Sequence, residues 1–284
     1  MNNARLLINA SRPLSWVNTA YPFAAGYIML GGGLSTIFIV GTIFFLIPYN
    51  LLMYGVNDVF DYESDMKNPR KGGVEGAVTP TKHHHLLLSS SFLLCVPFLI
   101  ALIWLGNFTS GIVLVGVMFF VVAYSIKGLR FKERPFIDSV TSSLHFVGPL
   151  VFAYALLGAG EGAWLVALSF FFWGMASHAF GAVQDINPDR DASIHSIATA
   201  IGARQTVWFS FGLYVASSLV LLSTANTFLI VAGLLVLAYA VNVAPYLTLD
   251  DAHSAKANRG WKRFLKLNYA VGAAVTILCI LSYK

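Results

Sequence analysis

The stretch NDVFDYESD carries three aspartates, Asp58, Asp61 and Asp65, at positions i, i+3 and i+7. On a helix this spacing places all three carboxylates on one face, where they repel each other. A hard cation such as Mg²⁺ prefers oxygen ligands and would relieve that repulsion, and Asn57 adds an amide oxygen. The alternative is a solvated acidic helix end that pairs with the basic residues that follow it: Lys67, Arg70 and Lys71.

A second acidic cluster lies in QDINPDRDAS, where Asp185 and Asp189 are spaced i, i+4. A helix would again place both carboxylates on one face. Pro188 argues against a regular helix here, so we expect local unwinding. Asp191 is a further acid, and we expect Arg190 to offset its charge. The alternative is a polar loop with an Asn-Pro turn.

Basic residues gather in the stretch YSIKGLRFKERP, which contains Lys127, Arg130, Lys132 and Arg134. Arginine binds phosphate oxygens through two parallel hydrogen bonds. Carboxylates that hold Mg²⁺ opposite such bases would form a diphosphate site, in which the metal ion bridges phosphate oxygens. The alternative is that these bases only set the orientation of the chain in a membrane.

The composition is that of an integral membrane protein. Of the 284 residues, 57% are hydrophobic and 11% are charged, and the mean hydropathy is +0.71. Soluble proteins contain about 25% charged residues, so this chain cannot cover itself with a polar surface. The net charge of +5 suits an anionic leaflet of a lipid bilayer and does not indicate a nucleic-acid partner. A diphosphate site at the mouth of an apolar bundle indicates a ligand with a charged head and an apolar tail.

We predict an all-α bundle of nine transmembrane helices, in a single domain over residues 1–284, with a short interfacial segment at 1–14. The nine expected spans are 15–32, 35–56, 85–104, 109–125, 136–157, 163–182, 206–223, 226–246 and 264–282. The breaks between them alternate between short, nearly uncharged segments and longer charged ones. With the N-terminus and the charged breaks on one side, that side holds 17 of the 18 Lys and Arg, all but Lys284. By the positive-inside rule it is cytoplasmic, so the C-terminus lies on the far side of the cell membrane.

These stretches resemble the UbiA superfamily of intramembrane prenyltransferases, which are nine-helix proteins with the motifs NDxxDxxxD and DxxxD in cytosolic loops. NDVFDYESD is similar to the first motif and DINPD to the second. The resemblance implies an active-site cap on the cytoplasmic side and a Mg²⁺-dependent enzyme. The metal ligands and catalytic residues that it implies are Asp58, Asp61, Asp65, Asp185 and Asp189. The diphosphate-binding residues that it implies are Asn57, Lys127, Arg130 and Lys132.

Within this superfamily, longer stretches such as FFLIPYNLLMYGVNDVFDYESDMKNPRKGGVEGAV look like the actinobacterial-type lycopene elongases. This resemblance implies transfer of five-carbon units from dimethylallyl diphosphate to both ends of lycopene or a related carotenoid, with addition of water in some members. It leaves open partner membrane subunits and a carotenoid cyclase that acts downstream. The alternatives are a UbiA-type enzyme with an aromatic acceptor for a quinone or chlorophyll precursor, and a membrane transporter with a divalent-ion gate.

The developing allylic cation and the proton that is released later each require a partner. Aromatic ring faces stabilise cations, and the candidates near the motifs are Tyr54, Tyr62 and Tyr124. Histidines are unusual within apolar spans, which makes His145 and His178 candidate proton acceptors. The alternatives are ring packing for the tyrosines and hydrogen bonding between helices for the histidines.

Overall fold

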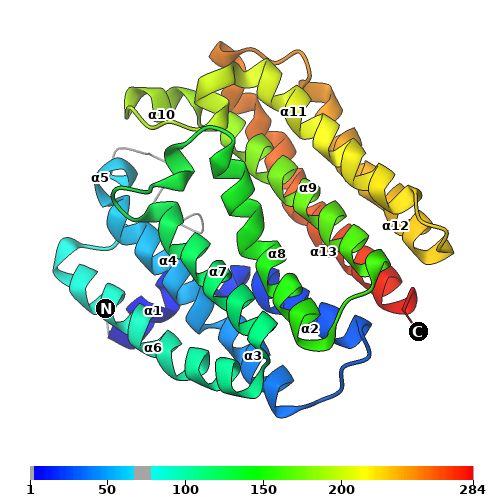
Figure 1. The fold of residues 1–284 in the computed structure, drawn as a ribbon. Coiled ribbons are helices and arrows are strands. Elements are labelled where there is room, and N and C mark those ends of the chain that lie inside the picture. The colour runs from blue at the N-terminus through cyan, green and yellow to red at the C-terminus, as the bar shows by residue number, and fades with distance from the viewer. Residues whose placement is uncertain (1–2, 67–77, 284) are drawn as a thin grey trace. The chain divides into compact units, whose positions relative to one another are not determined.

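The computed structural model describes residues 3–66 and 78–283, which form helices joined by turns, with no strand in that part of the chain (Figure 1). The all-α prediction is confirmed. The chain divides into two compact units. The first unit comprises Met1–Tyr27, Gly32–Phe131 and Gly148–Leu157, and the second comprises Ile28–Gly31, Lys132–Val147 and Gly158–Lys284.

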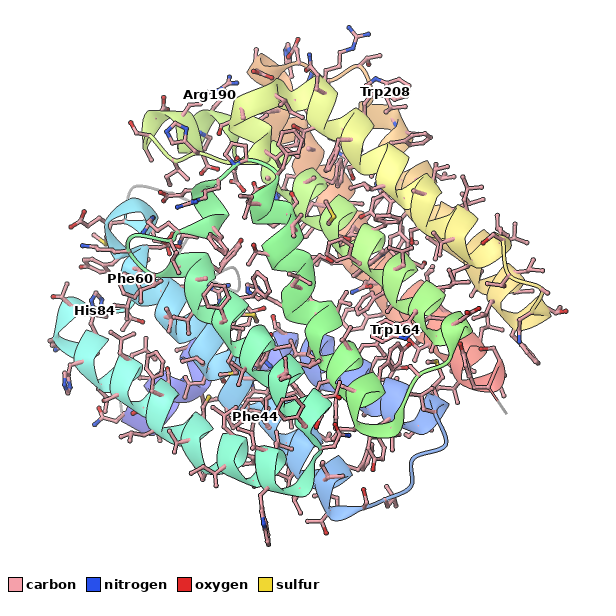
Figure 2. All side chains as sticks on the ribbon, in the orientation of Figure 1. Phe44, Phe60, His84, Trp164, Arg190 and Trp208 are labelled. Carbon is pink, nitrogen blue, oxygen red and sulfur yellow. The ribbon has the colours of Figure 1, made fainter. Side chains whose placement is uncertain are left out.

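The first unit contains most of the helices of the N-terminal half. They are α1 (Asn3–Ala10), the 3-10 turn η1 (Pro13–Ser15), α2 (Val17–Met29), α3 (Thr36–Leu46), α4 (Pro48–Phe60), α5 (Tyr62–Asp65), η2 (Thr81–His83), α6 (His84–Leu105) and α7 (Phe108–Ser125). Pro48 separates α3 from α4, because proline lacks the N–H that an uninterrupted helix needs. Phe60, at the end of α4, and His84, at the start of α6, mark the end of this unit that carries the first acidic cluster (Figure 2).

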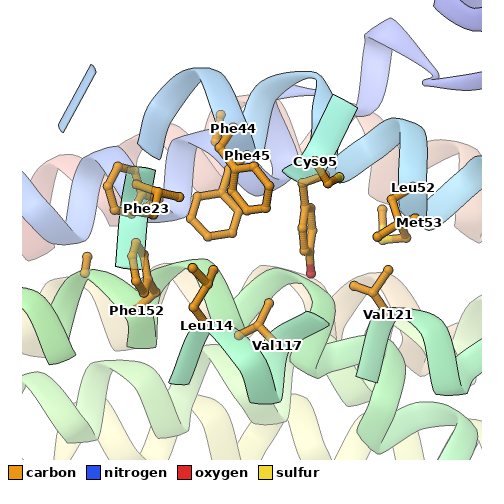
Figure 3. Packing of buried hydrophobic residues seen from close by; sticks show 14 of the residues in the cluster. Phe23, Phe44, Phe45, Leu52, Met53, Cys95, Leu114, Val117, Val121 and Phe152 are labelled. Atoms are coloured by element: carbon orange, nitrogen blue, oxygen red, sulfur yellow. The ribbon is translucent and has the colours of Figure 1, made fainter. Parts of the chain in front are cut away.

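An aromatic cluster forms the core of the first unit (Figure 3). The ring of Phe23 lies 5.3 Å from that of Phe45 and 5.8 Å from that of Phe152, measured between centroids. Farther along α4, a Cβ atom on Gly55 would lie 2.8 Å from Ser91 Oγ of α6. Glycine therefore allows α4 and α6 to approach closely, and both contacts fix the helix that ends at the acidic cluster.

The second unit is built on long helices. They are the first part of α8 (Ile137–Leu157), α9 (Glu161–Val183), the short α10 (Ile186–Asp191), α11 (Ile197–Leu222), α12 (Thr227–Val243), the 3-10 segments η4 (Ala244–Tyr246) and η5 (Asp251–Lys256), and α13 (Ala257–Leu281). A further 3-10 turn, η3 (Phe131–Glu133), lies where the units meet in the sequence. Helix α11 packs against α9 and α12, and α12 packs against α13. Figure 2 marks Arg190 on α10 and Trp208 on α11.

Eight helical segments of the described chain are long and apolar enough to cross a membrane. They are Thr36–Phe60, Thr81–Leu105, Phe108–Ser125, Ile137–Leu157, Glu161–Val183, Ile197–Leu222, Thr227–Tyr246 and Asp251–Leu281. The expected span at 15–32 contains α2, whose 13 residues measure about 20 Å, less than the roughly 30 Å of a bilayer core. The count of nine is therefore not confirmed. The single domain over 1–284 and the interfacial segment at 1–14 stay predictions.

Candidate active site

The three aspartates of the first cluster lie where α4 ends. Asp58 is on the last turn of α4, Asp61 follows the helix, and Asp65 closes α5. Their exposed fractions are 1%, 9% and 8%, so all three are buried. Helix α4 ends at Phe60, so the aspartates do not share one regular helix, although Asp65 N still donates to Asp61 O at 2.8 Å. The i, i+4 hydrogen bond expected of a helix is thus present between Asp61 and Asp65, but one straight helix does not carry all three aspartates.

Arg12 compensates the charge of Asp58, and the sequence interpretation missed it. Its Nη2 atom donates to Asp58 Oδ1 at 2.7 Å, and its guanidinium carbon lies 4.2 Å from the ring centroid of Tyr54. Arg12 has a left-handed backbone conformation, with φ of 50°, in the turn between α1 and η1. This turn directs the side chain back onto α4. The only sequence signal is a base directly before an apolar span, which the positive-inside rule already explains.

Arg130, one of the predicted diphosphate-binding residues, lies against the same cluster. Its Nη2 atom is 3.6 Å from Asp61 Oδ1, and its Nη1 atom donates to Phe60 O at 3.3 Å. The side chain therefore also satisfies a carbonyl at the C-terminal, negative end of α4. Asn57 Oδ1 accepts a hydrogen bond from Ser125 Oγ of α7 at 3.0 Å. The first unit thus brings together the amide, two carboxylates and two arginines.

The other two predicted bases follow α7 in the sequence. Lys127 is exposed in the turn after α7. Lys132 is half-buried in η3 and belongs to the second unit. The alternative partners of the aspartates lie outside the described residues: Lys67, Arg70 and Lys71.

The candidate aromatic residues differ in what covers their rings. Arg12 lies over one face of the Tyr54 ring. The Tyr62 ring makes an edge contact with His84, with centroids 5.1 Å apart. Tyr124 is half-buried on α7, one residue before Ser125. The Tyr54 ring already binds a cation in this structure, so cation binding at this ring is physically feasible.

The second cluster surrounds a short helix. Asp185 follows α9, and Asp189 lies on α10, where its backbone N donates to Asp185 O at 2.9 Å. Both side chains are half-buried. The regular helix is interrupted here, since α9 ends at Val183 and α10 begins at Ile186, but the break precedes Pro188. Pro188 itself lies in the first turn of α10, where a missing N–H costs nothing.

Arg190 pairs with an acid that the sequence did not indicate. Its Nη1 atom lies 2.7 Å from Asp251 Oδ2, and its Nη2 atom donates to Thr199 O at 3.1 Å. Asp251 Oδ1 also accepts from Ala203 N at 2.6 Å. Arg190 therefore links α10 to α11 and η5. We expected Arg190 to offset the charge of Asp191, but these contacts are with Asp251 and Thr199.

A buried polar chain extends from α8 to α9 in the second unit. Asp138 Oδ1 accepts from Ser139 N at 2.7 Å, and Ser139 Oγ lies 3.1 Å from His178 Nδ1. The other Asp138 oxygen accepts from Ile197 N at 2.7 Å, at the start of α11. His145 is also buried, and it follows Asp138 on α8. The sequence interpretation did not include Asp138, whose signal is an acid just inside an apolar span.

Mg²⁺ fits the donor chemistry of the first cluster. Within residues 3–66 and 78–283, no three His, Cys, Asp or Glu side chains converge as a metal-binding group. Mg²⁺ keeps several waters, however, and is usually held by one or two carboxylates together with substrate phosphates. Asp58 and Asp61 offer buried carboxylates, each of which has an arginine beside it. The residues therefore suit an ion that arrives together with a diphosphate.

Comparison with known proteins finds a prenyltransferase family and relatives named for carotenoid biosynthesis. The model of the UbiA prenyltransferase family matches residues 19–270. A lycopene elongase/hydratase from Corynebacterium glutamicum is 49% identical over 282 residues, which cover 99% of this chain and 98% of that protein. The C(50) beta-cyclic carotenoids biosynthesis protein LbtBC from a Dietzia species is 50% identical over 275 residues. These cover 96% of this chain but only 64% of the Dietzia protein.

Solved structures share the fold. A UbiA homolog from Archaeoglobus fulgidus bound to DMAPP and Mg²⁺ has a TM-score of 0.67 at 17% identity, over 93% of this chain and 98% of that one. A digeranylgeranylglyceryl phosphate synthase has a TM-score of 0.71 at 14% identity, over 100% of this chain and 99% of that one. At these identities the likeness concerns the fold alone. With the family match and the apolar helices, it follows that this multi-pass membrane protein belongs to the UbiA prenyltransferase family.

Proposed function

We propose that this protein is a lycopene elongase, which transfers dimethylallyl groups from dimethylallyl diphosphate to the ends of lycopene or a related carotenoid. The observation that carries the chemistry is the pair of buried carboxylates, Asp58 and Asp61, with arginines beside them at a helix end. The near full-length similarity to lycopene elongase/hydratases supports the acceptor. The name of those relatives includes a hydratase activity, which supports a water-adding branch for this chain as well.

We propose that five aspartates bind Mg²⁺ with the diphosphate: Asp58, Asp61, Asp65, Asp185 and Asp189. When bound, the metal ion neutralises the diphosphate and makes it a better leaving group. Arg130, Lys132 and Lys127 then bind phosphate oxygens, and Asn57, oriented by Ser125, adds an amide. Arg12 joins this set because it already lies against the Asp58 carboxylate.

The reaction forms one carbon–carbon bond. The carbon–oxygen bond to the diphosphate breaks, and its electron pair leaves with the diphosphate. The allylic carbon then accepts the electron pair of a terminal double bond of the carotenoid. The new cation loses a proton to a base, or it takes up water, which loses a proton in turn. The apolar walls exclude water from the first cation, and ring faces such as that of Tyr54 stabilise it.

His178 is the better supported of the two candidate proton acceptors. Ser139 Oγ contacts His178 Nδ1, and Asp138 holds Ser139. A hydroxyl and a carboxylate on one side of an imidazole fix its orientation and stabilise its charged form. His145 is also buried on α8 and is the second candidate.

We propose that the N-terminus and the charged loops are cytoplasmic and that the C-terminus lies on the far side. In the predicted nine-span arrangement one side holds 17 of the 18 Lys and Arg, which supports this orientation. A thiol reagent that cannot cross the membrane, applied to intact cells that carry Ser282→Cys or Lys82→Cys, tests it. We expect labelling of the first and not of the second.

The decisive experiment incubates the purified protein in lipid with Mg²⁺, dimethylallyl diphosphate and lycopene, and follows the products by chromatography and mass. We expect gains of one and two five-carbon units, loss of both with EDTA or Asp61→Ala, and normal activity of Glu63→Ala, an exposed acid in the same segment. Reaction with an aromatic acceptor and not with lycopene would keep the family and replace the acceptor. No release of diphosphate with any acceptor from folded protein would contradict the proposal.

A further inference from the structure

A basic pocket lies between the end of α12 and the start of α13. Its volume is about 620 Å³, and η4 and α13 form its walls. Four cationic side chains line it: Lys256, Arg259, Lys262 and Arg263. Tyr246 and Leu249 supply an apolar wall. All of these residues belong to the second unit, and the function proposed above uses none of them.

The nearby acids are already engaged by other groups. Asp250 accepts hydrogen bonds from the side chain and the backbone of His253, and Asp251 pairs with Arg190. The hydrogen bond from the His253 side chain lowers the pKa of Asp250 most, and Lys256 contributes least. Among the residues that the structure describes, no carboxylate forms an ion pair with Arg259, Lys262 or Arg263. The pocket therefore has a positive charge that an anion would neutralise.

The walls of the pocket are fixed by specific contacts. Arg263 Nη2 donates to the hydroxyl of Tyr246 at 3.3 Å, and Tyr246 is buried against Phe180 of α9. Asn258 Nδ2 donates to Gln184 Oε1 at 2.6 Å, one residue before Asp185. A mobile basic tail that only sets membrane orientation needs no such anchoring, so these contacts favour a formed binding site.

One face of α13 continues from the pocket as a surface suited to lipid. Lys262, Lys266, Tyr269 and Ile277 are separated by 4, 3 and 8 positions, which places them on one side of the helix. Tyr269 is 68% exposed and Ile277 is 55% exposed. Cations, then a tyrosine, then an apolar residue reproduce the order from the surface of a bilayer toward its core. A free diphosphate has no apolar part that could contact this exposed face of α13.

We propose that the pocket formed by Arg259, Lys262, Arg263 and Tyr246 binds a phosphate-bearing anion, and that its occupant is the headgroup of an anionic phospholipid. The acyl chains of that lipid lie along the exposed face of α13. The inference stands on the pocket, and it does not depend on the prenyl-transfer reaction.

The test titrates phosphatidylglycerol or phosphatidylcholine onto the full chain in detergent and counts bound lipids by native mass spectrometry. We expect one phosphatidylglycerol to bind in preference to phosphatidylcholine. Arg259→Gln/Lys262→Gln should weaken that binding about tenfold, because each neutralised cation removes part of the attraction to the headgroup. Arg259→Lys/Lys262→Arg, which keeps both charges, should bind as the wild type does. Arg5→Gln/Lys82→Gln, two exposed cations elsewhere, is the matched control.

A parallel titration with inorganic pyrophosphate and no Mg²⁺ distinguishes the source of the phosphate. Pyrophosphate binding that the double variant weakens, with phosphatidylglycerol unaffected, would keep the anion site and replace lipid by free diphosphate as the occupant. Equal binding of both anions by the wild type and the double variant would overturn the site. Equal unfolding midpoints of the two proteins in neutral detergent exclude misfolding as the cause of any loss.

Discussion

The two acidic clusters differ in how deeply their carboxylates are buried and in what the arginines beside them contact. In the first unit, Asp58 and Asp61 are buried and each lies beside an arginine. In the second, Asp185 and Asp189 are half-buried, and the nearby Arg190 pairs with Asp251 instead. A buried carboxylate is costly without a cation, whereas a half-buried one keeps part of its hydration. Loss of a carboxylate should therefore cost more stability in the first cluster than in the second.

The largest expected effect is on the rate of diphosphate release. Substitutions in the two clusters should slow it equally but should differ in their effect on stability. Asp58→Asn and Asp185→Asn should each slow diphosphate release by about 10³-fold, because under the proposed function each removes a carboxylate that holds Mg²⁺ against the diphosphate. Asp58→Asn should also lower the free energy of unfolding by about 2 kcal/mol, since it leaves Arg12 without its ion pair. That value is modest because the Arg12 side chain is 17% exposed. Asp185→Asn should change stability by less than about 0.5 kcal/mol. Equal losses of stability would break the comparison, and Glu63→Gln is the control.

Arg12 allows a second test of the first cluster. Arg12→Gln should reduce kcat/KM for dimethylallyl diphosphate by about 100-fold, because it removes a charge-assisted hydrogen bond to a buried carboxylate. Arg12→Lys keeps the charge but not the planar contact with the Tyr54 ring, so it should recover part of the loss. Steady-state kinetics of the two variants beside Tyr54→Phe, which keeps the ring, measures this. A full recovery by lysine would show that only charge matters at this position.

The sequence indicated local structure well and missed most contacts between distant residues. Apolar runs predicted the helices, and the spacing of the aspartates predicted an acidic cluster at a helix end. The contacts of Arg12 with Asp58, Arg190 with Asp251 and Asp138 with Ile197 join residues 46, 61 and 59 positions apart. The periodicity of apolar and polar residues does not indicate which distant side chains pair with each other. Arg190 was instead assigned to its neighbour Asp191, because adjacency is the only pairing that a sequence displays.

The length of α2 illustrates the other limit of sequence reasoning. Residues 15–32 are apolar enough for a span, but Pro13 and the 3-10 turn η1 delay the start of the helix to Val17. Arg12 takes a left-handed conformation in this same turn, which brings it to Asp58. Hydropathy is averaged over a window that includes this turn, so it predicts a longer helix. It also gives no sign that the turn brings Arg12 to Asp58.

His178 gives a smaller effect, on the products rather than the rate. If the second unit supplies the proton acceptor, His178→Gln should lower the ratio of the proton-loss product to the hydrated product by about tenfold, because a general base is lost. His145→Gln should leave the ratio unchanged. Mass analysis of the pigments measures both ratios. A change with His145→Gln alone would reassign the acceptor, and a change with neither would favour the departing diphosphate as the base.

The smallest expected effect comes from Arg190, and it is the sharpest check of the comparison. The side chains of Arg190 and Asp251 are 43% and 37% exposed, so the pair should contribute about 0.5 kcal/mol or less. Arg190→Gln also leaves the Asp251 contact with Ala203 N intact, so α10 keeps its attachment to α11 through Asn187 and Asp251. We expect unfolding midpoints and transfer rates close to those of the wild type. If Arg190→Gln were as damaging as Arg12→Gln, the second cluster would depend on its arginine as the first does, and the distinction between the two units would be wrong.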